Sequence, residues 1–149
     1  LSENEIAIIE RSWNVVKPDL TSAGEAVLYR LFEKYPHNQQ YFAQFKNVPL
    51  ESLKGSTSFR KHVIRVMTVL KNAVEALRLD SADEKIHELF LEVGNNHAKR
   101  NITKESYNEL RESIFVTLTA ACELNSEEQE VWDKFLNCAF DISLTTVKE

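Results

Sequence analysis

Apolar residues recur at helical spacing along nearly the whole chain, and this pattern limits the folds that the sequence can adopt. No Asn-Gly or Asp-Gly hairpin signal occurs, and no segment alternates apolar and polar residues over several positions. The chain has only 3 Gly and 3 Pro, and Pro18, Pro36 and Pro49 lie at or near the expected breaks between helices. The sequence therefore predicts an all-α fold.

Capping signals indicate where several of these helices begin. The expected N-caps are Ser2 with Glu5, Ser22 with Glu25, Ser81 with Glu84, Asn125 with Glu128, and Thr103. The expected helices are a first one to about residue 17, then 22–34, a short one from Pro36, 56–79, 81–99, 103–124 and 126–147, with a loose region at 47–55. Helices of such unequal length favour an irregular sandwich around a pocket over a four-helix bundle.

Length and composition indicate one ordinary globular domain, residues 1–149. The chain is 43% apolar and 28% charged, and its net charge of -5 without a basic stripe argues against a nucleic-acid partner. No stretch approaches the roughly 20 apolar residues of a membrane span, so we expect no membrane partner. The acidic start is unlike a signal peptide, which predicts a cytoplasmic location. Because the chain does not begin with Met, a removed leader and an extracellular location form the alternative.

Two histidines lie on apolar stripes of separate helices. His62 falls in line with Phe59 and Val66, and His97 follows Leu89 and Val93 at intervals of four. Taken singly, an inward histidine is more often a core residue bonded to a backbone carbonyl. As a pair they lack further zinc ligands at a recognisable spacing, but they suit a flat cofactor whose metal brings four ligands, as haem does. The other two, His37 and His87, are expected to be solvated.

The residues around these histidines resemble the globin family over nearly the whole chain. Segments 31–36, 61–66 and 96–99 match the globin join between the second and third helices, the distal segment and the proximal segment. The residues that carry the resemblance, in order, are Trp13, Pro36, Phe42, His62, Val66 and His97. The later part of the chain, from Ile102 to Trp132, is most similar to invertebrate intracellular globins of nematode or insect type.

The resemblance implies seven or eight helices in a three-over-three sandwich around one haem b. His97 would be the proximal iron ligand, its other ring N–H donating to a carbonyl near Val93, with Asn96 as a further acceptor. On the distal side His62 would donate to bound oxygen or become the sixth iron ligand. Phe42 would stack on the haem, and Phe45, Val66, Leu28 and Val93 would keep the pocket dry. Arg65 would either pair with a propionate of the haem or be solvated. We place Tyr29 outside the pocket.

The function implied is reversible oxygen binding for storage, transport or facilitated diffusion, by a monomer or weak homodimer that is not an enzyme. Carbon monoxide and nitric oxide would bind at the same place. The alternative is a bis-histidyl globin with a redox, nitric-oxide or sensing role. A haem-free helical regulatory module would explain the helices but not Phe42 with the paired histidines.

The join between the two histidine helices departs from vertebrate myoglobins. His62 and His97 are several residues further apart, and we expect the extra residues around 77–84. A longer join would allow the distal helix to swing toward the iron. We nevertheless expect five-coordinate iron before a gas binds, because Leu28 and Val66 leave space for a diatomic ligand.

Overall fold

Helices make up the fold, as the spacing of apolar residues predicts. The computed structural model describes residues 1–148 and contains no strand within them. The elements are α1 (Glu3–Val16), η1 (Lys17–Asp19), α2 (Leu20–Lys34), η2 (Pro36–Tyr41), η3 (Leu50–Gly55), α3 (Thr57–Ala76), α4 (Ala82–Ala98), α5 (Lys104–Ala121) and α6 (Ser126–Leu144), where η marks a 3₁₀ helix. None of the helices in residues 1–148 combines the length and the apolarity that crossing a membrane requires.

Three of the expected helix starts are confirmed by their hydrogen bonds. Ser2 with Glu5 and Asn125 with Glu128 form complete capping boxes, in which side chain and backbone bond each other reciprocally. The hydroxyl of Thr103 accepts from a backbone N–H in the first turn of α5. These caps satisfy N–H groups that have no partner inside the helix.

One expected cap is at another residue, one expected helix start lacks its side-chain cap, and one region is more ordered than expected. The side chain of Asp19 accepts from the backbone N–H of Ser22, so α2 begins at Leu20 and Ser22 lies inside it. The residue that caps the helix, Asp19, lies three positions before the expected cap. Ser81 precedes α4 but makes no side-chain cap. Part of the region expected to be loose forms η3.

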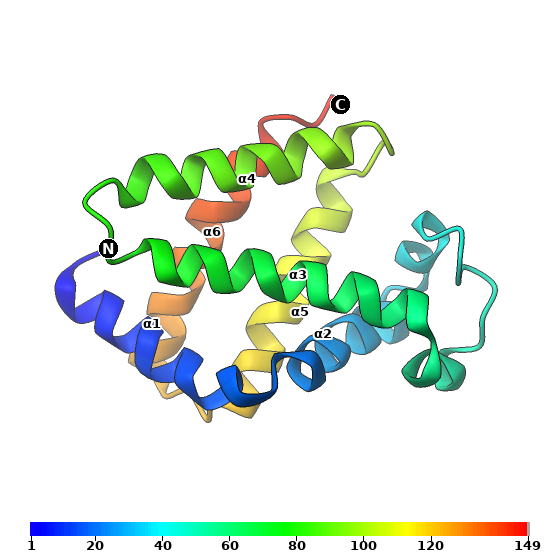
Figure 1. Ribbon diagram of the computed structural model, residues 1–149, viewed down its shortest axis with the longest axis horizontal. Helices are drawn as coiled ribbons and strands as arrows, with labels where there is room; N and C mark the ends of the chain where they lie inside the picture. The colour runs from blue at the N-terminus through cyan, green and yellow to red at the C-terminus, as the bar shows by residue number, and fades with distance from the viewer. Residues whose placement is uncertain (149) are drawn as a thin grey trace.

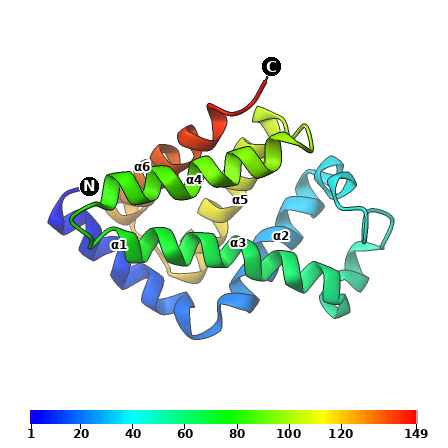
Figure 2. The ribbon, with the colours of Figure 1, turned by 45° about the horizontal axis from the view of Figure 1, so that its top comes forward.

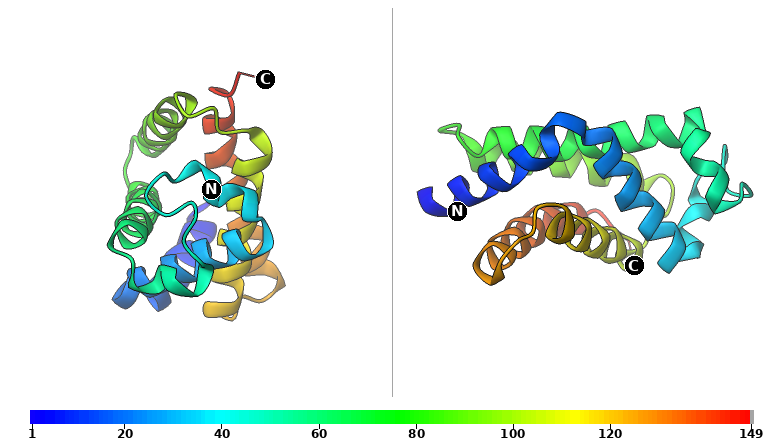
Figure 3. Two further views of the ribbon diagram at one scale, coloured as in Figure 1. Left: turned by 90° about the vertical axis from the view of Figure 1, so that its right-hand side faces the viewer. Right: turned by 90° about the horizontal axis from the view of Figure 1, so that it is seen from below.

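The helices form two layers of three. Figure 1 shows α3 and α4 crossing in front of α5 and α6, and the right-hand view of Figure 3 separates α5 and α6 from the layer that holds α1, α3 and α4. The most extensive packing between the layers joins α4 to α6 and α2 to α3, and α2 packs on α5 within the second layer. Figure 2 shows α3 and α4, the two histidine helices, running beside each other. The predicted three-over-three sandwich is confirmed.

Two glycines allow the histidine helices to approach the opposite layer closely. A Cβ added to Gly24 of α2 would lie 2.6 Å from side-chain atoms of Val63 and Met67 in α3. A Cβ added to Gly94 of α4 would lie 2.6 Å from Thr146 and 3.0 Å from the carbonyl oxygen of Ser143. Both separations are too short for a real side chain, so the crossings depend on glycine. These crossings set the positions of α3 and α4.

Buried serines tie neighbouring helices together, one between the two layers and one within the second layer. The hydroxyl of Ser143 donates to the carbonyl of Phe90 over 2.7 Å, joining α6 to α4. Ser113 donates to the carbonyl of Val27 over the same distance, joining α5 to α2. Each bond satisfies a buried hydroxyl and is worth about 0.5–1.5 kcal/mol. The helices that surround the cavity described below are thereby held in register.

Candidate functional site

A cavity of about 490 Å³ lies between the helices that carry the two histidines. This volume is within the range of roughly 300–1,000 Å³ found for sites that hold small molecules and cofactors. The sequence-predicted residues that line it are Leu28, Phe42, His62, Arg65, Val66, Val93, Asn96 and His97. Helical periodicity and the family resemblance therefore identified residues on several sides of the cavity. Phe45 is the one predicted pocket residue that does not line the cavity.

His97 lies in the last turn of α4 and is held by its own helix. Its Nδ1 is 2.7 Å from the carbonyl oxygen of Val93, which confirms the expected bond one turn back. A carbonyl oxygen can only accept, so Nδ1 carries the proton and Nε2 keeps its lone pair. Asn96 lines the cavity but makes no hydrogen bond to His97 within residues 1–148. The ring is therefore prepared, by one backbone bond, to bind a metal through Nε2.

His62 reaches the same cavity from α3 and is kept neutral there. The pKa of its ring is lowered from 6.5 to about 4, mainly by burial and to a smaller extent by electrostatic interactions with His97, Arg65 and Arg100. Its ring meets the ring of Phe42 edge-on, with centroids 4.5 Å apart. A neutral imidazole offers one N–H donor and one lone pair. At neutral pH His62 can thus donate a hydrogen bond or bind a metal.

Phe42 follows η2 and presents an aromatic surface to the cavity. Behind it Phe45 stacks almost parallel, with centroids 4.8 Å apart and an angle of 13°. Phe45 is only 2% exposed and packs with Phe32 and Phe59 in a small core of its own. The prediction that Phe45 contacts the cofactor is corrected accordingly. Its three-residue spacing from Phe42 places it behind that ring as a support.

Three cations surround the mouth of the cavity, in a chain whose net charge is -5. Arg65, Lys99 and Arg100 line the cavity and are exposed. None of the three pairs with a carboxylate in the described part of the chain. Sequence reasoning named only Arg65, although Lys99 and Arg100 directly follow the proximal segment. Together they form a rim that suits an anionic group at the edge of a bound molecule.

Tyr107 of α5 is a further cavity residue that sequence reasoning missed. Its hydroxyl is buried without a hydrogen-bond partner, and burial raises its pKa to about 12. Its ring centroid lies 6.1 Å from that of His97. A buried hydroxyl without a partner is costly, so a group that fills the cavity could offer it one.

The aromatic residue Tyr29 is outside the cavity as predicted, with its ring under the Lys54 ammonium at 5.4 Å.

The remaining histidines differ from one another. His87 is exposed on α4, as expected. The side chain of His37 is 49% exposed but lies 2.8 Å from a carboxylate oxygen of Glu109, so the expectation of a merely solvated ring is wrong. The carboxylate comes from α5, 72 positions along the chain, and local sequence could not reveal it.

These features fit a haem. The cavity has walls of mostly apolar side chains, an aromatic face at Phe42, a metal-binding nitrogen on His97 and cations at its mouth. A haem needs a proximal ligand, apolar faces and partners for two carboxylates. The unpartnered Tyr107 hydroxyl also indicates that the cavity accommodates another group.

Comparisons with known proteins agree with this site. The family model described as Globin matches residues 25–143. Cytoglobin-1 of Oryzias latipes is 39% identical over 102 residues, a match that covers 68% of this chain but only 56% of that relative. A hexa-coordinate haemoglobin of Drosophila melanogaster, in a structure described by its cyanide binding, superposes with a TM-score of 0.96 at 30% identity over 99% of this chain and 96% of that one.

Insect relatives recur among the similar structures. Haemoglobin from the botfly Gasterophilus intestinalis superposes with a TM-score of 0.89 at 31% identity, over 98% of both chains. Similarity to insect globins, expected from the later part of the sequence, is therefore confirmed. On the match of the family model and on these similarities, the chain belongs to the globin family.

Proposed function

We propose that this globin holds one haem b in its cavity and binds oxygen reversibly, for storage, transport or facilitated diffusion. The proposal makes it a gas-binding protein and not an enzyme. The observation that carries it is the pair of histidines, one from α3 and one from α4, that line a single cavity of about 490 Å³. The hydrogen bond from His97 Nδ1 to the carbonyl oxygen of Val93 also supports the proposal, because it holds the ring in the tautomer that leaves Nε2 able to bind iron.

The proximal side of the cavity holds and orients the cofactor. Nε2 of His97 binds the metal, while Val93 fixes the plane of the ring through its carbonyl. Phe42 stacks on the haem face and is backed by Phe45. The cations of the rim, Arg65, Lys99 and Arg100, pair with the propionates. A bound haem supplies an iron with an open position for a diatomic gas.

The distal side determines how long the gas stays. Neutral His62 donates its ring N–H to the gas, and Phe42 keeps the imidazole in place by edge contact. Leu28, which is 1% exposed, and Val66 line the same space and exclude water. A dry site strengthens the hydrogen bond from His62, because no water competes for it.

A second candidate is a bis-histidyl globin, in which His62 itself takes the sixth position until a gas displaces it. Two observations favour it. The Drosophila structure with a TM-score of 0.96 is described as hexa-coordinate. The low pKa of His62 also leaves its lone pair free at neutral pH. Redox, nitric-oxide or sensing roles would then replace simple storage.

Replacing His62 by leucine distinguishes the two candidates. If the protein is a carrier, His62→Leu removes a hydrogen bond to a partly charged ligand, worth about 1.5–3 kcal/mol. Oxygen should then dissociate about 10- to 150-fold faster, as measured by stopped-flow displacement with carbon monoxide. In a bis-histidyl protein the same change removes a competing ligand, and carbon monoxide association should accelerate greatly.

The matched variant His62→Gln keeps a side-chain N–H donor in the same place. It should retain slow oxygen dissociation to a larger extent than His62→Leu. Unchanged oxygen dissociation in His62→Leu, together with unchanged carbon monoxide association, would remove His62 from both candidate roles.

A further inference from the structure

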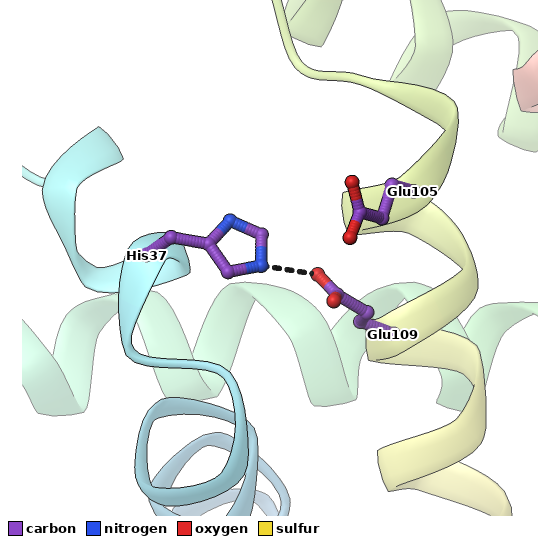
Figure 4. Close-up of side chains that lie close together, drawn as sticks. All are labelled: His37, Glu105 and Glu109. Atoms are coloured by element: carbon purple, nitrogen blue, oxygen red, sulfur yellow. Dashed lines mark ion pairs between the residues drawn. The ribbon is translucent and has the colours of Figure 1, made fainter.

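A second group of metal-binding side chains lies outside the haem cavity, between η2 and α5. Figure 4 shows His37 facing Glu105 and Glu109, and the potential ligand atoms of the three residues all lie within 4.8 Å of one another. The two glutamates are four residues apart, so they share one face of α5. His37 Nε2 and Glu109 Oε1 are already in contact at 2.8 Å.

We propose that His37, Glu105 and Glu109 bind one divalent transition-metal ion, with Zn²⁺ as the best match. Zinc takes imidazole nitrogen and carboxylate oxygen at about 2.0–2.2 Å, which places tetrahedral ligand atoms about 3.4 Å apart. The ligand atoms lie within 4.8 Å of one another, and His37 and Glu105 are exposed, so their side chains can rotate to close the remaining distance. The imidazole selects against Ca²⁺ and Mg²⁺, which prefer oxygen ligands alone.

Glu109 is held in position before a metal arrives. Glu109 is only 8% exposed, and the side-chain amide of Asn38 donates a hydrogen bond to its Oε1 over 3.0 Å. Ligating carboxylates are commonly oriented in this way by an outer hydrogen bond. Asn38 also donates to the carbonyl of Tyr35 over 3.3 Å, which anchors it to the turn before η2.

The charge balance of the site also favours a cation. Nearby basic side chains have carboxylate partners elsewhere: Arg30 and Lys34 bind Glu112, and Arg111 pairs with Asp133. Two carboxylates neutralise the two charges of the ion. The ion takes the place of the proton on His37 Nε2, and that proton passes to water.

The surroundings leave room for the rest of the coordination shell. A groove of about 580 Å³ opens on this side of α5, and both Glu105 and Glu109 line it. Water from the groove can supply the fourth ligand, as in open three-ligand zinc sites. This groove shares no lining residue with the haem cavity, so the proposed metal site does not depend on the proposed function.

Calorimetric titration with Zn²⁺ tests the site. The protein is used haem-loaded and bound to carbon monoxide, so that His62 and His97 are not available to the added metal. We expect one Zn²⁺ per chain and no binding of Mg²⁺ at the same concentration. His37→Ala and Glu105→Gln should each weaken zinc binding at least about tenfold, since even outer-shell partners are worth 10- to 100-fold.

Two control variants exclude other zinc ligands on the surface. His87→Ala removes an exposed histidine and Cys138→Ser an exposed cysteine, neither of which belongs to the group. Both variants should bind Zn²⁺ like the wild type. No zinc uptake by the wild type, unchanged affinity in His37→Ala and Glu105→Gln, or loss of binding in His87→Ala or Cys138→Ser would overturn the proposal.

Discussion

His97→Ala should abolish stable haem binding. The variant loses the only imidazole on α4 that lines the cavity, since the other histidine described on that helix, His87, does not line it. Haem titration of the apoprotein should give about one haem per chain for the wild type and only weak, reversible uptake for the variant. Added imidazole should restore binding, because it can occupy the space left by the ring.

His87→Ala is the matched control for this experiment. It removes an exposed histidine from the same helix and should bind haem like the wild type. Tight haem retention by His97→Ala without imidazole, with an unaltered spectrum, would show that His97 is not the ligand.

Phe42→Ala should release haem much faster than the wild type. Truncating a well-packed phenylalanine costs about 3–5 kcal/mol. The ring faces the cavity on one side and Phe45 on the other, so much of this cost falls on the haem-bound state. Each 1.4 kcal/mol corresponds to a tenfold faster loss, so we expect an increase of more than about tenfold. Transfer of haem to an excess of an apomyoglobin acceptor measures this rate.

Phe115→Ala provides a control for general destabilisation. Phe115 is a half-buried phenylalanine of α5 that does not line the haem cavity. Its truncation should lower the free energy of unfolding but leave haem transfer nearly unchanged. If Phe42→Ala and Phe115→Ala release haem at the same rate, the stacking role of Phe42 is wrong.

The sequence predicted the residues whose positions depend on local periodicity. His62 and His97 line the cavity because each continues an apolar stripe of its own helix. The bond from His97 to Val93 was predictable for the same reason, since a four-residue spacing places a side chain over the preceding turn.

Contacts between distant segments were not predictable in this way. Phe45 was expected in the pocket, but the direction of its ring depends on how the chain turns after η2. The pairing of His37 with Glu109 depends on how α5 packs beside η2, which no local pattern encodes. The role of Gly24 likewise appears only once α2 and α3 are seen to cross.

The visible spectrum of the reduced, gas-free protein tests the central claim most directly, namely that His97 alone binds the haem iron and His62 acts on the gas. We predict a single broad band, typical of five-coordinate iron, that stays the same in His62→Leu. The physical reason is the space lined by Leu28 and Val66 beside His62. Two sharp bands in the wild type that collapse to one in His62→Leu would contradict this account and establish the bis-histidyl alternative.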